Sequence, residues 1–307
     1  MPIPLSAATL ALGRRVCTGL LGVDVLARQD GEDFALAVVN MDLDSEFSPE
    51  PFSGWAAARS YWEQIRADAA ALPELDRRVY YDELCGSTLS FIAWRYDGIS
   101  FEEQLANFLH CPAQPASEAE LQTIKDEIYE LLGGLGYAGD LAARCAAWED
   151  HCRVPAEDVP EVLGKLMDEA WERCNGDLLP DGIPAPKSDA MQVKPVRGVA
   201  FNARCGYLDR TIELNVDPVL TLPSLKHLAV HEGYPGHYVQ FKMREHMYQT
   251  GQAAADVLLS IVNSASSSVF EGIGAASRHL FLIGAILMIS KRDHLTKIGS
   301  GQTYRKS

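Results

Sequence analysis

The sequence contains no hydrophobic run long enough to span a bilayer. Its longest uncharged apolar stretch, HLFLIGAILMIS, runs only from His279 to Ser290, whereas a membrane-spanning helix needs about 20 apolar residues. The N-terminal stretch MPIPLSAATLALGRRVCTGLLGVDVLA has no basic segment before its apolar run, and arginines interrupt that run. We therefore expect a core helix there rather than a signal peptide, and we expect no membrane partner.

Paired cysteines and an excess of basic charge are also lacking. The seven cysteines are scattered, their number is odd, and no CxxC pair occurs, which favours reduced thiols in a cytoplasmic protein over a disulfide framework. The chain has 27 Lys and Arg residues against 42 Asp and Glu residues, for a formal net charge of −15. Because so acidic a chain repels a phosphate backbone, we expect no nucleic-acid partner.

Helical periodicity dominates the N-terminal half of the chain. The stretches SFEEQL, with Ser100 and Glu103, and SEAELQ, with Ser117 and Glu120, have the Ser-x-x-Glu form of a capping box. In a capping box each side chain accepts a hydrogen bond from the other residue's backbone, which marks the start of a helix. We therefore expect helices to begin after Ser100 and after Ser117.

The composition changes at residues 175–195, where Pro, Gly and Asp gather. This stretch predicts a boundary between a helical N-terminal lobe, residues 1–190, and a second lobe, residues 191–307. In the second lobe, polar and apolar side chains alternate along TIELNV, residues 211–216, which predicts a strand. The fold class expected is mainly α (α+β), with a small β element beside the helix that carries the motif described next.

The stretch HLAVHEGYPGH carries the residues of a zinc-hydrolase motif at an unusual spacing. In the common pattern, two histidines four residues apart bind zinc from one face of a helix, and the Glu after the first His is the general base. Here His231 and His237 are six residues apart, a rotation of about 240° on an unbroken helix. Pro235 cannot donate a backbone hydrogen bond, and Gly236 permits conformations that other residues resist. We therefore expect a distorted helix between Gly233 and His237, with both imidazoles facing one point.

Zinc needs a third protein ligand and an open position for water. Glu271, in SSVFEGIGAAS, is the candidate, because acidic residues are rare around it and a buried carboxylate should be paired or bind metal. Glu232 would take the proton of the metal-activated water and pass it to the leaving group. Two other interpretations fit the same residues: YPG could be a turn that ends a helix, or His227 and His231 could form a metal face without His237.

The stretch LAVHEGYPGHYVQ resembles the signature of the bacterial domain of unknown function 885 family, whose members carry HE-x-x-PGHH or a close variant. NARCGYLDRTIELNVDPVL is similar to the segment before that signature, VFEGIGA to the S-E-G-I-A-D stretch after it, and LPELDRRVYYDEL to the N-terminal half. The likeness runs from about residue 50 to residue 280. It implies a mostly helical, gluzincin-like metallohydrolase, often described as a peptidase, in which His231, His237 and Glu271 bind one Zn²⁺ ion and Glu232 is the base.

The chain departs from the family pattern at three points. Tyr238 stands where members often carry a second His, so this position is not expected to be an essential ligand. Ala275 stands where an Asp, four residues after the ligand Glu, would orient a ligand imidazole, and loss of such a carboxylate can weaken metal binding. Members also extend well beyond the Glu helix, whereas this sequence ends soon after it in the basic stretch KRDHLTKIGSGQTYRKS, which raises the question of a missing cleft wall.

The sequence thus predicts a zinc-dependent hydrolase that cleaves a peptide or other amide bond with a metal-activated water. Tyr207 is a candidate donor to the developing oxyanion, as are Arg204 and Tyr234, although each fits a structural role better. An extended peptide could pair with the strand TIELNV beside the cleft. Two alternatives remain open: a metal-dependent enzyme of a small metabolite, and a truncated non-catalytic relative that keeps the fold.

Overall fold

The computed structural model describes residues 5–31, 37–41, 46–112, 114–177 and 191–282. The helical segments are α1 (Ala7–Gln29), α2 (Trp55–Ala70), α3 (Leu75–Tyr96), α4 (Phe101–Phe108), α5 (Glu118–Gly134), α6 (Leu141–Cys152), α7 (Val159–Asp177), α8 (Leu222–Leu228), the π-helix η2 (Ala229–Gly233), α9 (His237–Gln249), the 3-10 helix η3 (Ala255–Leu258) and α10 (Ala265–Leu282). The strands are β1 (Ala37–Asn40), β2 (Gln192–Val196), β3 (Ala203–Gly206), β4 (Thr211–Asn215) and β5 (Leu259–Ile261). The expected mainly α (α+β) class is confirmed.

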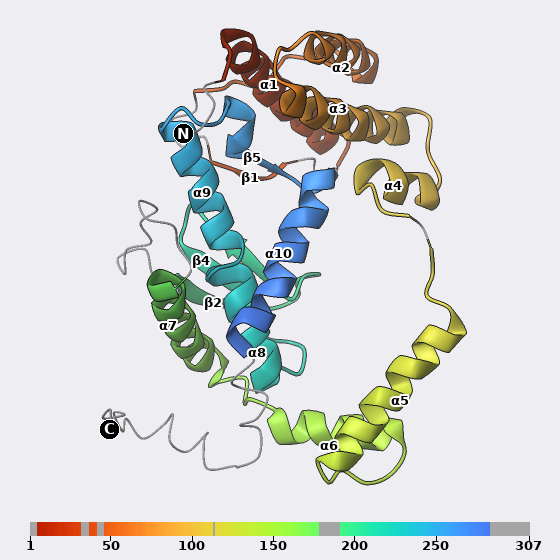
Figure 1. Ribbon diagram of the computed structural model, residues 1–307, viewed down its shortest axis with the longest axis vertical. Coiled ribbons are helices and arrows are strands. Elements are labelled where there is room, and N and C mark those ends of the chain that lie inside the picture. Colours follow the sequence, from red (N-terminus) through yellow and green to blue (C-terminus); the bar gives the residue numbers. More distant parts are fainter. Residues whose placement is uncertain (1–4, 32–36, 42–45, 113, 178–190, 283–307) are drawn as a thin grey trace.

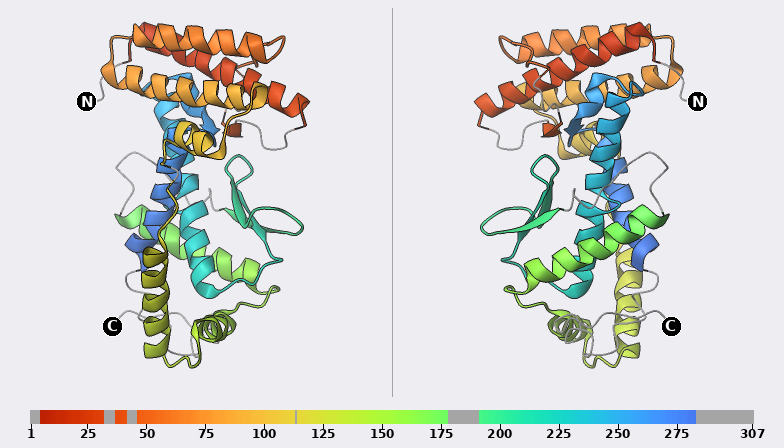
Figure 2. Two further views of the ribbon diagram at one scale, coloured as in Figure 1. Left: turned by 90° about the vertical axis from the view of Figure 1, so that its right-hand side faces the viewer. Right: turned by 90° about the vertical axis from the view of Figure 1, so that its left-hand side faces the viewer.

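Helices α1, α2 and α3 form a layer at one end of the molecule (Figure 1). From this layer α9 and α10 run side by side toward α8, with α7 beside them, and α5 and α6 form a hairpin at the opposite end. The sheet formed by β2, β3 and β4 extends to one side of α9 (Figure 2). The motif segment therefore lies in the middle of the molecule, between the helical layer and the hairpin.

The helix starts predicted from the sequence are confirmed. The side chain of Ser100 accepts a hydrogen bond from the N–H of Glu103 at 3.2 Å, and the carboxylate of Glu103 accepts one from the N–H of Ser100 at 2.8 Å. Ser117 and Glu120 make the same pair of bonds at the start of α5. Each cap of this kind stabilises a helix by about 0.5–2 kcal/mol.

The apolar N-terminal stretch forms α1, the core helix that we expected. Val16, Leu20 and Val23 of this helix are completely buried, and they share one face because they are three or four residues apart. Across the part of the chain that the structure describes, no helix has both the length and the apolar character to cross a membrane. The apolar run that begins at His279 lies mostly outside the described residues.

The expectation that an extended peptide pairs with TIELNV is wrong. This stretch forms β4, which lies in the centre of its sheet, with β2 parallel on one side and β3 antiparallel on the other. Both rows of backbone hydrogen-bonding groups of β4 are therefore already paired, and a strand can be added only at a sheet edge. The alternation that identified the strand carries no information about its neighbours.

The chain on either side of the predicted lobe boundary packs together. Helix α7 lies before residue 190, yet it contacts β2, α8 and η2, which lie after it. On the other side of the molecule β1 pairs with β5, and α1 contacts η3. Residues 178–190, which hold most of the predicted linker, lie outside the described residues, and the division at residue 190 stays a prediction.

Candidate metal centre

The helix that carries the motif is interrupted where the sequence predicts an interruption. Helix α8 passes at Ala229 into η2, in which the N–H of Tyr234 donates to the carbonyl of Ala229, five residues back, at 3.3 Å. Helix α9 begins only at His237. Between them Pro235 has no N–H with which to continue the helical ladder. The predicted distortion between Gly233 and His237 is confirmed.

Gly236 makes this sharp return of the chain sterically possible. A Cβ atom at this position would lie 1.8 Å from the carbonyl oxygen of His231 and 2.4 Å from that of Val230. Any side chain would therefore collide with the backbone that it crosses. The N–H of Gly236 donates to the carbonyl of Val230 at 3.0 Å, so the close approach is also hydrogen-bonded, and it brings His237 back over His231.

The structure brings His231, His237 and Glu271 together. The two imidazole rings lie edge to face with their centroids 4.6 Å apart. The Nε2 atom of His231 is 3.2 Å from Oε2 of Glu271, and the Nε2 atom of His237 is 3.2 Å from Oε1 of the same carboxylate. The ligand atoms of the three residues all lie within 4.8 Å of one another. The six-residue spacing is thus compatible with one shared point, and the role of these residues as ligands stays a prediction.

The site is closed on the side of the histidines and open on the side of the carboxylate. The side chains of His231 and His237 are 14% and 15% exposed, whereas that of Glu271 is 59% exposed. The sequence predicted a buried carboxylate at this position, and this expectation is wrong. Glu271 lies on α10, where the residues that follow it, Gly272 and Ile273, are themselves exposed.

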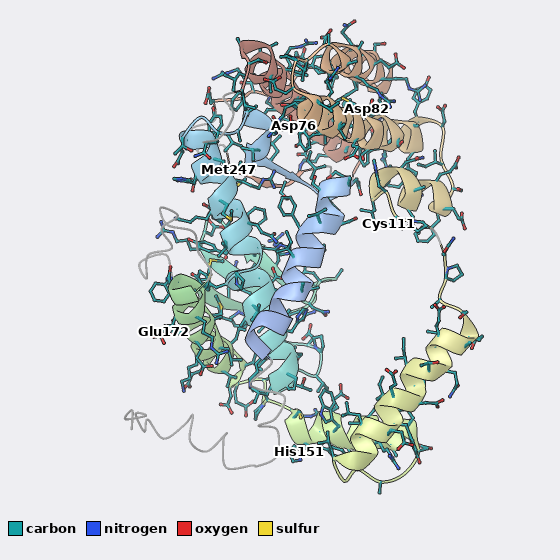
Figure 3. All side chains as sticks on the ribbon, viewed as in Figure 1. Asp76, Asp82, Cys111, His151, Glu172 and Met247 are labelled. Carbon is teal, nitrogen blue, oxygen red and sulfur yellow. The ribbon has the colours of Figure 1, made fainter. Side chains whose placement is uncertain are left out.

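Helix α10 is held in place by contacts at Ser268, near its start, and at Gly274, one to two turns further along. Near its start, the hydroxyl of Ser268 donates to the carbonyl of Leu109 at 3.1 Å and lies 3.8 Å from the sulfur of Cys111, at the end of α4 (Figure 3). Further along, Gly274 lies against His231: a Cβ atom there would be 2.8 Å from the ring nitrogen Nδ1. The absence of a side chain at Gly274 lets α10 approach the imidazole.

Glu232, the predicted general base, is buried beside the three residues, with an exposure of 6%. Burial, together with the charge of Glu271, raises the pKa of its carboxyl group, while His237 and a hydrogen bond from the backbone of Cys205 in β3 act in the opposite direction. A carboxyl group with a raised pKa suits both the uptake and the release of a proton.

The candidate oxyanion donors have other partners. The hydroxyl of Tyr207 donates to the carboxylate of Glu245 at 2.6 Å. The guanidinium of Arg204 pairs with Glu213 on β4. Tyr234 is 1% exposed, so its ring belongs to the core. A catalytic role for Tyr207 stays a prediction, and it would require the hydroxyl to leave Glu245.

Tyr238, which the sequence does not predict to be a ligand, occupies the interior. It is 1% exposed, and its ring lies 5.4 Å from that of Tyr207 and 5.3 Å from that of Tyr234. Since it follows His237 directly on α9, its side chain points about 100° away around the helix. Its buried ring therefore anchors the start of α9, next to the helix break, in the core.

Two residues of the site were missed in the sequence, Gln240 and Gly274. The side-chain oxygen of Gln240 lies 2.9 Å from Nδ1 of His237. Its position three residues after His237 on a helix was a signal that could have been used, because such pairs lie on one face. Gly274 had no comparable signal, because its role depends on how α10 packs against η2.

Two imidazoles and one carboxylate match a catalytic zinc ion in the kind and number of ligands. Burial, followed by the proximity of His237, lowers the pKa of His231, which favours the neutral imidazole that a metal requires. One ligand atom from each residue lies within 4.8 Å of the other two, so the three groups converge on one region. The residues therefore fit the ion.

Comparisons of the chain with protein-family models, with curated proteins and with solved structures found no match.

Proposed function

We propose that this protein is a zinc-dependent hydrolase of peptide or other amide bonds. In this proposal His231, His237 and Glu271 hold one zinc ion, and Glu232 is the general base. The observation that carries the proposal is the break between α8 and α9, which turns two histidines six residues apart toward one carboxylate. The resemblance of HEGYPGH and VFEGIGA to the domain of unknown function 885 family supports the same assignment.

A bound zinc ion would supply a Lewis acid that polarises a carbonyl group and lowers the pKa of a water molecule. The protein's own contribution is a base held at a fixed position. Glu232 follows His231 directly, and the N–H of Cys205 donates to its carboxylate. That hydrogen bond orients the carboxylate while burial raises its pKa, so Glu232 can accept a proton and then return it to a leaving amine.

The exposure of the three proposed ligands gives the direction from which a substrate would arrive. The histidines are buried on the side of η2 and α9, while most of the Glu271 side chain is exposed. A substrate would therefore approach across the exposed side of α10. Access from this side is compatible with a chain substrate such as a peptide and also with a small amide.

Metal analysis of purified protein tests the ligand set. We expect about one zinc ion per chain in the parent, and loss of the metal in His231→Ala and in His237→Ala. His227→Ala is the matched control, because this ring lies 5.2 Å from that of His231 and outside the group of three. Loss of zinc in His227→Ala, with retention in His237→Ala, would instead support the four-residue histidine pair.

A panel of peptides and small amides then separates the remaining functions. Turnover of peptides supports the proposed hydrolase, and turnover of small amides alone supports an enzyme of a small metabolite. Tight zinc binding without turnover of any member supports a non-catalytic relative. Glu232→Gln is assayed beside the parent, because it is expected to keep its metal but lose the reaction. Hydrolysis that persists at the parent's rate in this variant would indicate a contaminating enzyme or another base.

A further inference from the structure

We propose that Gln240 is a positioning residue of the metal centre, which fixes the tautomer of His237 and ties this imidazole to the helix that carries Glu271. The inference deepens the proposed function and rests on it for the metal, but not for the tautomer. Gln240 lies on α9, one turn after His237, and is only 8% exposed. A buried amide at this position must have its hydrogen bonds satisfied by neighbouring groups.

Both ends of the Gln240 amide have a partner. Its nitrogen Nε2 donates to the backbone carbonyl of Phe270 at 3.1 Å. Its oxygen Oε1 lies 2.9 Å from Nδ1 of His237. Phe270 directly precedes Glu271, so the amide connects one proposed ligand to the backbone next to another. The connection runs between α9 and α10, which also meet where the guanidinium of Arg244 lies over the ring of Phe270.

The polarity of these two bonds follows from one fixed point. A backbone carbonyl can only accept, so the amide group that faces Phe270 must be the NH₂ group. The oxygen of Gln240 must then face His237, and because this oxygen also only accepts, Nδ1 of His237 must carry a proton. The lone pair of a neutral His237 is therefore on Nε2, the nitrogen that faces Glu271. A metal needs the lone pair on that nitrogen.

Gln240 thus orients His237 in the way that, in the resembling family, an Asp at the position of Ala275 would orient a ligand imidazole. Partners of this kind orient the ring and select its tautomer, and their loss typically weakens metal binding by about 10–100-fold. The other proposed histidine has a different neighbour, since Nδ1 of His231 faces the backbone at Gly274. Among the described residues, a side chain lies within hydrogen-bonding distance of Nδ1 in His237 but not in His231.

The experiment compares Gln240→Met with the parent. Methionine has a similar volume and neither hydrogen-bonding group, so it removes both bonds with little loss of packing. Gln240→Glu keeps an acceptor toward His237 but removes the donor to Phe270. Gln249→Met is the control, because Gln249 is an exposed glutamine at the end of the same helix.

The first measurement is the tautomer of His237 in the metal-free protein, from the ¹⁵N shifts of its ring at a pH where imidazole is neutral. We expect a proton on Nδ1 in the parent, in Gln240→Glu and in Gln249→Met, and a mixture of tautomers in Gln240→Met. The second measurement is zinc affinity, which should fall about 10–100-fold in Gln240→Met and stay within twofold in Gln249→Met. Thermal unfolding of the metal-free variants controls for a loss of fold.

A glutamine that only joins two helices would change the unfolding temperature without changing the tautomer. The inference is overturned if Gln240→Met keeps the parent's tautomer or binds zinc as tightly as the parent. It is also overturned if the parent itself shows a mixture of tautomers. If the parent has the fixed tautomer but binds no zinc, the proposed function is wrong. The role of Gln240 in fixing the tautomer would still stand, so the two failures can be told apart.

Discussion

The candidate metal centre and the polar cluster around Asp256 are both built around a carboxylate, but the groups that face the carboxylate differ. Asp256, in η3, is 5% exposed and accepts a hydrogen bond from the hydroxyl of Tyr81 at 2.8 Å. Tyr80 also donates to it, and Arg77 and Arg244 place positive charge nearby. Two hydroxyl donors thus face one carboxylate, and the nearby positive charge complements its negative charge.

In the candidate metal centre, by contrast, a carboxylate oxygen of Glu271 faces a nitrogen of His237 that can only accept. The two oxygens of Glu271 face the Nε2 atoms of His231 and His237 at 3.2 Å, and the contact to Gln240 leaves the Nε2 of a neutral His237 without a proton. Such an arrangement is favourable only with a cation or a proton among the three groups. Asp256 thus has its donors within the protein, whereas Glu271 and His237 lack a positive charge between them, which supports the proposal that a cation binds there.

The largest expected effect separates the two carboxylates of the metal centre. Glu232→Gln should keep the metal and lower the rate of hydrolysis by about 10²–10⁴-fold, because an amide cannot accept a proton at neutral pH. Glu271→Gln should lose both metal and activity, because it removes the anionic member of the set. Metal analysis and steady-state rates on both variants check this. Unchanged turnover in Glu232→Gln would show that another group is the base.

The next effect concerns the cluster around Asp256. Asp256→Ala should lower the free energy of unfolding by about 3–5 kcal/mol, because it leaves buried donors of Tyr80 and Tyr81 unpaired. Asp82→Ala is the control: Asp82 lies on the same helix as these tyrosines (Figure 3), and its pair with Arg66 is exposed, a type worth about 0–1 kcal/mol. Zinc content per folded chain should not change in either variant. Loss of zinc in Asp256→Ala would show that the two clusters are coupled.

The features that the sequence predicted correctly are those set by residues close together in the chain. The helix starts at Ser100 and Ser117 and the break at Pro235 and Gly236 depend on residues close together in the chain, and all were found. The neighbours of β4, the partner of Tyr207 and the role of Gly274 depend on the packing of distant segments. The exposure of Glu271 was mispredicted for the same reason, since it depends on which elements cover α10.

A further difference between the clusters should appear in the pH dependence of stability. Burial raises the pKa of Asp256, so the folded state holds this proton to a higher pH than the unfolded state. The free energy of unfolding must therefore fall as pH rises from the ordinary pKa of Asp through the raised folded value. Asp256→Asn has no such proton. The stability of the parent minus that of this variant, from urea unfolding at several pH values, should decrease with rising pH, and a constant or increasing difference contradicts the prediction.

The smallest effect tests how closely α10 must approach the metal centre. Gly274→Ala adds a methyl group that would lie 2.8 Å from Nδ1 and 3.0 Å from Cε1 of His231, so the imidazole or the helix must move by a few tenths of an ångström. We expect zinc affinity to fall about tenfold, the low end of the range for residues that orient a ligand. Gly272→Ala is the matched control, because it lies on the same helix and a Cβ atom there would meet nothing within 4 Å. Both substitutions should favour the helix by about 0.5–1 kcal/mol before any clash, so a common rise in stability cancels between them. Competition with a chelator of known affinity measures the difference, and equal zinc affinity in the two variants would show that the position of His231 does not depend on Gly274.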